Sequence, residues 1–314
     1  WMHTPAGYEL RDGVFYPTDW WAIVFNPSFP YRLVHMVLAA YLTTAFVILG
    51  VGAWYRLKGT AHEASRVMLT MGVAFVSIVT PLQIVAGDFH GLKTLEYQPA
   101  KIAAMEAHWD TEEGAALALF AWPDAENETN HYEIAVPNLA SLILTHEWNG
   151  KLVGLKDFPP SERPPVAPIF FSFRIMVGLG LLMLLAGMLG LWLAFRGRLF
   201  DSRAYHRYLV AMIPSGFIAV LAGWITTEIG RQPYTVYGLL RTSDSLSPVG
   251  APSVLATLIT FVIVYGIVFG AGLYYIVRVV RTGPEKAPAH PVPDPYAPPA
   301  RPLSYPNEPV GEKS

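Results

Sequence analysis

Five long apolar runs constrain the fold of this chain more than any other feature. Crossing the hydrocarbon core of a bilayer takes roughly 20 helical residues. The runs reach that length and cover residues 33–55, 67–87, 169–195, 208–230 and 254–277. With 53% hydrophobic and only 15% charged residues, the composition is not that of a water-soluble domain. The sequence therefore predicts an all-α fold, a polytopic transmembrane helical bundle with five spans.

Basic residues set the expected orientation of these spans. They gather after the first, third and fifth runs, as Arg56, Lys58 and Arg66, as Arg196, Arg198, Arg203 and Arg207, and as Arg278, Arg281 and Lys286. Connections rich in lysine and arginine stay in the cytoplasm. We therefore expect the chain before residue 33, the long connection 88–168 and the link 231–252 to lie outside.

The runs also divide the chain into segments. We expect a periplasmic N-terminal segment (1–32), two transmembrane helices (33–87) and a large periplasmic loop (88–168). Three further transmembrane helices (169–280) and a disordered, proline-rich cytoplasmic tail (281–314) would follow. Loops as long as the third segment usually carry function or are disordered. Its charge and turn residues favour a folded element outside the lipid.

A short helix is expected early in this loop, opened by Pro99. Its apolar stripe comprises Ile102, Met105 and Trp109. Lys101 and Glu106 border the stripe on either side. From pattern alone, an interfacial helix with solvated charges is the favoured interpretation, and a functional pair of charges is the alternative.

Three residues within the apolar runs have side chains suited to binding iron or an anion. His35 is the only one of nine histidines placed inside a run, and it could ligate haem iron or simply bond a neighbouring helix. Arg174 needs an anion in hydrocarbon, and a haem propionate would serve. Met176 alone would indicate packing, but a histidine and a methionine together suit a six-coordinate, electron-transferring haem.

A second group of such residues ends the fourth run. Trp224, Glu228 and Arg231 follow helical spacing, which would place them on one helix face before Pro233 stops the helix. Charged residues at membrane depth are candidates for function. Glu228 could ligate a high-spin haem or transfer protons, or it could form an ion pair with Arg231.

Composition excludes several other classes of protein. A net charge of −2, with no basic face, argues against a nucleic-acid partner. The absence of cysteine excludes covalent c-type haem, thiolate-ligated iron and disulfides.

Several motifs, in their order along the chain, resemble subunit I of the cytochrome bd-type quinol oxidases. They are LVHMV around His35, a GDFHG turn after the second run, KIAAMEAHWDT, LFAWPDAENETN, GLKDFPP, PPVAPIFFSFRIMVG and GWITTEIGRQP. The chain is similar to the C-terminal two-thirds of that subunit, in the cyanide-insensitive branch with a short quinol loop. The family's first four helices have no counterpart here, so we expect the fragment alone to be inactive.

The resemblance implies a role for each candidate residue. His35 and Met176 would be the axial ligands of low-spin haem b, with Arg174 beside it. Lys101 and Glu106 would bind and oxidise quinol in the loop.

For the GWITTEIGRQP motif, the resemblance implies a second haem site. Glu228 would ligate a high-spin haem b, Trp224 would pack against that haem, and Arg231 would lie nearby.

The resemblance further implies an oxidoreductase of the bacterial cytoplasmic (inner) membrane. Ubiquinol or menaquinol would be oxidised at the outer face, and oxygen would be reduced to water at a haem b paired with haem d or a further haem b. This activity would add to the proton gradient. The expected partners are quinol, oxygen, subunit II and a small accessory membrane subunit.

Two other functions remain open from the sequence. One is a membrane electron-transfer cytochrome b that reduces no oxygen. The other is a polytopic channel or transporter whose Arg174 and Glu228 bind substrate, although it leaves the KIAAMEAHWD motif without an explanation.

Overall fold

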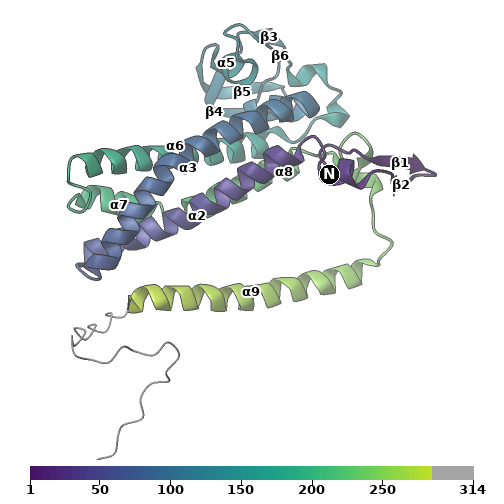
Figure 1. Cartoon of the computed structure of the whole chain (residues 1–314). Coiled ribbons are helices and arrows are strands. Elements are labelled where there is room, and N and C mark those ends of the chain that lie inside the picture. Colours follow the sequence, from purple (N-terminus) through teal and green to yellow (C-terminus); the bar gives the residue numbers. More distant parts are fainter. Residues whose placement is uncertain (285–314) are drawn as a thin grey trace, which may run out of the picture.

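Long helices dominate the computed structural model, which describes residues 1–284 (Figure 1). Five helical segments are long and apolar enough to cross a membrane, which confirms the predicted five-span bundle. They are α2 (Phe29–Lys58), α3 (His62–Tyr97), α6 (Val166–Phe195), α7 and α8 together (Arg203–Ala211 and Ser215–Ile229) and α9 (Ala251–Thr282). Pro214 separates α7 from α8, because proline disfavours the helical conformation of the residue before it. Most of the predicted tail lies outside the described residues.

Helix α3 continues well beyond the predicted second span. It ends at Tyr97, so the GDFHG segment is helical and the predicted turn is wrong. Helical packing overrides the weak propensity of its glycines. His90 therefore lies within the second helical span, and His206 lies within the fourth. The expectation that His35 is the only histidine in a span is also wrong.

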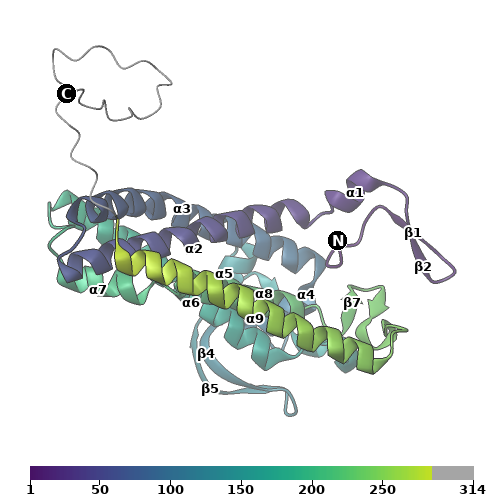
Figure 2. The same cartoon turned by 90° about the horizontal axis from the view of Figure 1, so that it is seen from below.

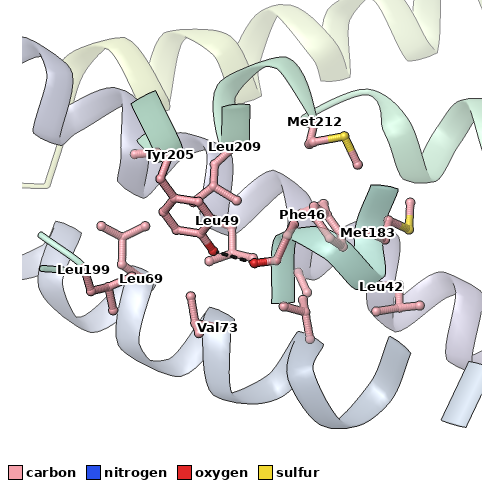
Figure 3. Packing of buried hydrophobic residues seen from close by; sticks show 14 of the residues in the cluster. Leu42, Phe46, Leu49, Leu69, Val73, Met183, Leu199, Tyr205, Leu209 and Met212 are labelled. Atoms are coloured by element: carbon pink, nitrogen blue, oxygen red, sulfur yellow. Dashed lines mark hydrogen bonds between the residues drawn. The ribbon is translucent and has the colours of Figure 1, made fainter. Parts of the chain in front are cut away.

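The core of the bundle lies between α2, α3, α6 and α7 (Figure 3). Phe46 and Leu49 are fully buried there, and the Tyr205 hydroxyl donates to the carbonyl of Ala186 at 2.8 Å. Helix α8 approaches α2 closely, because an ideal Cβ on Gly216 would lie 2.5 Å from Cα of Thr43. Small residues of this kind let membrane helices pack backbone to backbone.

Helix α9 stands apart from this bundle. None of its residues is buried, and Figures 1 and 2 show it running alongside the other helices as a separate layer. The Tyr55 hydroxyl of α2 donates to the carbonyl of Val280 at 2.8 Å. This hydrogen bond ties the last part of α9 to the bundle.

The chain between α3 and α6, residues 98–165, folds into a small unit that we call the cap. It contains α4 (Pro99–Glu106), β3 (Glu112–Glu113) paired with β6 (Lys151–Leu152), the hairpin of β4 (Leu117–Asp124) and β5 (Thr129–Val136), α5 (Leu139–Thr145), and the short helices η1 (Leu155–Asp157) and η2 (Pro160–Glu162). A second core cluster joins α4 and β4 to the start of α6, through residues such as Ile102, Ala118 and Phe170. The cap is therefore packed onto the end of the bundle.

Shorter elements complete the same end of the molecule (Figure 1). They are the hairpin of β1 (Tyr8–Arg11) and β2 (Val14–Pro17), α1 (Trp20–Val24), the hairpin of β7 (Tyr234–Val236) and β8 (Leu240–Arg241), and η3 (Thr242–Asp244). All three connections that were expected to lie outside thus meet at one end.

Candidate functional site

His35 lies in the second turn of α2 and faces α3. The side-chain nitrogen of Gln83 is 3.3 Å from both imidazole nitrogens, and the ring of His90 is centred 5.5 Å away. An ideal Cβ on Gly87 would lie 3.3 Å from Cε1 of His35, so glycine keeps space beside the ring. The Nε2 atom of His90 is buried and has no hydrogen-bond partner within residues 1–284.

Met176 on α6 lies at a similar level of the bundle. An ideal Cβ on Gly223 of α8 would be 2.8 Å from its sulfur. Gly216 of α8 touches Thr43 of α2, and these two helices run in opposite directions. From this contact, Gly223 lies seven residues further along α8, a rise of about 10.5 Å. His35 lies eight residues back along α2, a rise of about 12 Å in the same direction. Met176, which touches Gly223, and His35 therefore lie at nearly the same height in the bundle.

The two residues fit a haem. Histidine and methionine form a known axial pair for six-coordinate iron, and Gly87 and Gly223 leave the backbone beside them without side chains. Within the described part of the chain, no group of three or more His, Cys, Asp or Glu residues could hold a bare metal ion. A porphyrin supplies four ligands of its own, so one side chain on each face is sufficient.

Arg174 pairs with a residue of the cap. Its guanidinium donates to Oε2 of Glu106 at 2.6 Å and, through Nε, to the carbonyl of Ala118 at 2.7 Å. The rings of Phe170 and Phe173 lie 4.7 and 5.5 Å from it, in cation–π contact. The side chains of the ion pair are only 16% and 7% exposed. Glu106 thus provides an anion for Arg174, a carboxylate of the chain itself where the sequence had suggested a haem propionate.

Lys101 is buried at the opposite end of α4 from Glu106. It is 3% exposed, and its amine donates to Oε1 of Gln98 at 3.0 Å. Burial, reinforced by the positive charges of Arg32 and Arg231, lowers the pKa of Lys101 to about 7, against the opposing influence of Glu228. The interpretation of Lys101 and Glu106 as solvated charges is therefore wrong, because α4 is enclosed between the bundle and the rest of the cap.

The two loop residues do not meet each other. Lys101 faces the end of α8, where an ideal Cβ on Gly230 would lie 2.5 Å from its Cε atom. Glu106 faces α6 through Arg174. Helix α4 therefore connects two regions of the site.

Glu228 and Arg231 form the expected ion pair at the end of α8. The Arg231 guanidinium donates to Oε2 of Glu228 at 2.5 Å, and Nε2 of His3 lies 3.7 Å from Oε1 of the same carboxylate. Two further nitrogens of Arg231, Nε and one terminal nitrogen, are buried without a partner in residues 1–284. Burial, with Arg32, Lys101 and Arg231 adding to it, lowers the pKa of His3. A further anionic group would satisfy this cationic cluster.

The helix geometry expected for this motif is only partly correct. Helix α8 ends at Ile229, one residue before its C-cap Gly230, so Arg231 reaches Glu228 from a turn and does not lie on the helix. Trp224 is 63% exposed. Its ring is available to a neighbour outside the described bundle.

Sequence reasoning missed several residues of the site. Gln98 and His3 are joined by a hydrogen bond of 2.8 Å from the Gln98 amide to the His3 carbonyl, a contact between segments that are far apart in the chain. Arg32 lies one turn before His35, so helical spacing could have identified it. His90 was missed because the GDFHG segment was predicted to be a turn.

Comparison with known proteins gives a consistent result. The family model for cytochrome bd terminal oxidase subunit I matches residues 1–284. Subunit 1 of the cytochrome bd ubiquinol oxidase of Bacillus subtilis (strain 168) is 35% identical, over 94% of this chain and 66% of that protein. Subunit 1 of the cytochrome bd-II ubiquinol oxidase of Escherichia coli (strain K12) is 28% identical, over 91% and 69%.

A solved structure has the same fold. The bd oxidase from Geobacillus thermodenitrificans matches with a TM-score of 0.82 and 32% identity, covering 90% of this chain and 65% of that one. The present chain thus spans about two thirds of the length of its relatives. From its matching motifs, its five-span bundle and these similarities, the chain belongs to the cytochrome bd terminal oxidase subunit I family.

Proposed function

We propose that this chain is the quinol-oxidising and electron-transferring part of subunit I of a bd-type quinol oxidase. The contact between Glu106 of the cap and Arg174 of α6 carries this proposal. It joins a residue expected to react with quinol to α6, the helix that also carries Met176. The proposed proton acceptor is thus fixed by a buried ion pair to the helix that would supply one haem ligand.

The donor sets support two haem sites. His35 and Met176 would hold a low-spin haem b, and Glu228 would hold a high-spin haem b. The unpartnered nitrogens of Arg231 suit an acidic group such as a propionate, and Trp224 offers an exposed ring for packing. Haem, when bound, supplies one-electron redox chemistry.

The protein's own residues would handle quinol and its protons. The Lys101 amine is able to donate a hydrogen bond to a quinol oxygen, and Glu106 would accept a proton from a quinol hydroxyl. Arg174 fixes the Glu106 carboxylate through Oε2. Lys101 is buried beside the end of α8, away from bulk water, which strengthens these polar contacts.

The complete protein would then reduce oxygen to water, in the bacterial inner membrane. The oxygen site would need haem d or a further haem b from the rest of the subunit, together with subunit II and a small accessory subunit. The cap would face the periplasm and the end of α9 the cytoplasm. Relatives are named both as ubiquinol and as menaquinol oxidases, so the quinol could be of either kind.

Glu106→Gln in the complete subunit, purified with its partner, tests this function. The amide keeps the size of the side chain but cannot accept the proton, so we expect haem reduction by quinol to slow by about 100-fold or more. Reduction by dithionite, which bypasses the quinol site, should not change. Glu113→Gln, an exposed change on β3, is the matched control.

Unaltered reduction by quinol in the Glu106→Gln variant would contradict the proposal. Oxygen uptake in the same samples separates an oxidase from a cytochrome that only transfers electrons. Absence of haem from the purified complex would instead favour a transporter.

A further inference from the structure

A cavity opens in the cap directly beside Glu106. It measures about 230 Å³ and lies between the end of α4, the start of β3 and the β4–β5 hairpin. Five carboxylates and one imidazole are among the side chains that line it: Glu106, Asp110, Glu112, Glu128, Glu133 and His108. This volume is enough for several water molecules.

Glu106 lies at the buried end of this cavity and the other carboxylates lie toward solvent. Glu106 is 8% exposed, whereas Asp110, Glu112 and Glu133 are exposed. The cavity therefore connects a buried carboxylate to the surface along a wall of acidic groups. No lysine or arginine lines it.

Cations outside the cavity hold two of its carboxylates in place. Lys156 donates to both oxygens of Asp110 at 2.8 Å, and Arg163 donates to Glu128 at 2.5 Å. Each of these two carboxylates is therefore held by a cation at the edge of the cavity.

The remaining carboxylates of the wall have weaker partners. Glu133 accepts a hydrogen bond from the Asn130 amide at 3.0 Å. Glu112 lies 3.9 Å from Nδ1 of His108. Neither of these two carboxylates forms an ion pair with a lysine or arginine of residues 1–284.

His108 lines the same cavity as Glu106, Glu112 and Glu133. Helix α4 ends at Glu106, and Ala107 adopts a left-handed conformation that turns the chain, so His108 follows at the cavity wall. Its Nδ1 faces Glu112, and its Nε2 is buried without a hydrogen-bond partner in the described residues. An imidazole with two such nitrogens can take a proton at one and release it from the other.

We propose that this cavity is the exit route for quinol protons, from Glu106 through His108 to Glu112 and Glu133. The proposal rests on the proposed function of Glu106. Each quinol oxidised to quinone breaks two O–H bonds and yields two protons and two electrons, and the haem that His35 and Met176 would hold would supply the one-electron acceptor for them. The protons pass from Glu106 along the cavity to the outer solvent, so Glu106 is ready for the next one.

The experiment uses the complete oxidase with its partner subunit, reconstituted in nanodiscs. Haem reduction after mixing with quinol is followed by stopped-flow absorption, and proton release by a pH-sensitive dye. The variants are His108→Gln and the double change Glu112→Gln with Glu133→Gln. Glu113→Gln and Glu126→Gln are the controls, because both residues are exposed but neither lines the cavity.

Both cavity variants should slow quinol-driven haem reduction and proton release together, by about tenfold, with a larger solvent deuterium isotope effect. Dithionite reduction, the haem spectrum and the affinity for a quinone-analogue inhibitor should match the wild type. Added imidazole should restore much of the rate in His108→Gln, which a purely structural defect would not allow.

The outcomes separate this inference from the proposed function. Control-like rates in both cavity variants, with slow reduction in Glu106→Gln, would overturn the exit route and leave the quinol site standing. Normal reduction in Glu106→Gln would overturn both. If His108→Gln fails to fold, the double carboxylate variant on the exposed wall decides the question alone.

Discussion

At the residue scale, the candidate ligands were identifiable from chemistry but their partners were not. His35, Arg174 and Glu228 were conspicuous because such side chains are rare in apolar runs. The pairing of Arg174 with Glu106 joins residues 68 positions apart, and spacing carries no information on such contacts. Burial of Lys101 was missed for the same reason, since it depends on packing between distant segments.

Met176→Leu tests the proposed axial ligand. Leucine keeps nearly the same volume but removes the thioether, so the low-spin haem spectrum should disappear while the fold is retained. Absorption spectroscopy of the reduced complex, with circular dichroism for the fold, checks this. Met188→Leu is the matched control, because Met188 is exposed on the same helix. A wild-type low-spin spectrum in Met176→Leu would remove Met176 as a ligand.

Lys101 should make inhibitor binding depend on pH near neutrality. Its pKa is lowered from 10.5 to about 7, so the amine is charged below that pH and neutral above it. A charged donor binds a quinone oxygen more strongly, so affinity for a quinone analogue should fall about tenfold as the pH rises from 6 to 9.

Titration calorimetry of two variants identifies the group responsible. Lys101→Met should bind weakly at every pH, because it has no donor. Lys101→Arg should keep its charge and lose the pH dependence. A flat wild-type profile would show that Lys101 does not contact the ligand.

At the scale of single elements, hydrophobicity predicted the spans well and their ends poorly. Apolar runs must be helical in lipid because backbone groups have no other partners there. Polar residues at the ends of a span can either extend the helix or form a turn, and tertiary packing determines which of the two occurs. Helix α3 therefore extends through GDFHG to Tyr97, whereas α8 ends at Ile229, so that Arg231 lies in the turn that follows.

The contact between α8 and α2 should depend on one glycine. In Gly216→Ala the new Cβ would meet the backbone of Thr43, so the helices must separate, at a cost of about 1–3 kcal/mol. Thermal unfolding in detergent should show the loss. Gly178→Ala on α6 is the control, since nothing lies within 4 Å of its Cβ position. Equal stability of both variants would show that α8 can shift without loss.

At the scale of the whole molecule, the sequence predicted the bundle but not its arrangement. Five spans were expected, and residues 1–284 contain five. Helix α9 has no buried residue, whereas α2, α3, α6 and α7 enclose a core. The sequence could not predict this difference, because the five apolar runs have similar hydropathy. The site likewise depends on three separate connections meeting at one end of the bundle, which spans of alternating direction allow but do not specify.

Orientation in the membrane gives the last prediction. The chain contains no cysteine, so single cysteines introduced into it can be labelled without background from this subunit. Glu126→Cys lies at the tip of the β4–β5 hairpin, and Thr60→Cys lies in the exposed turn between α2 and α3. Because basic residues surround that turn, it should face the cytoplasm. A membrane-impermeant maleimide should therefore label Glu126→Cys in spheroplasts and reach Thr60→Cys only after permeabilisation, and the reverse pattern would place the quinol site on the cytoplasmic side.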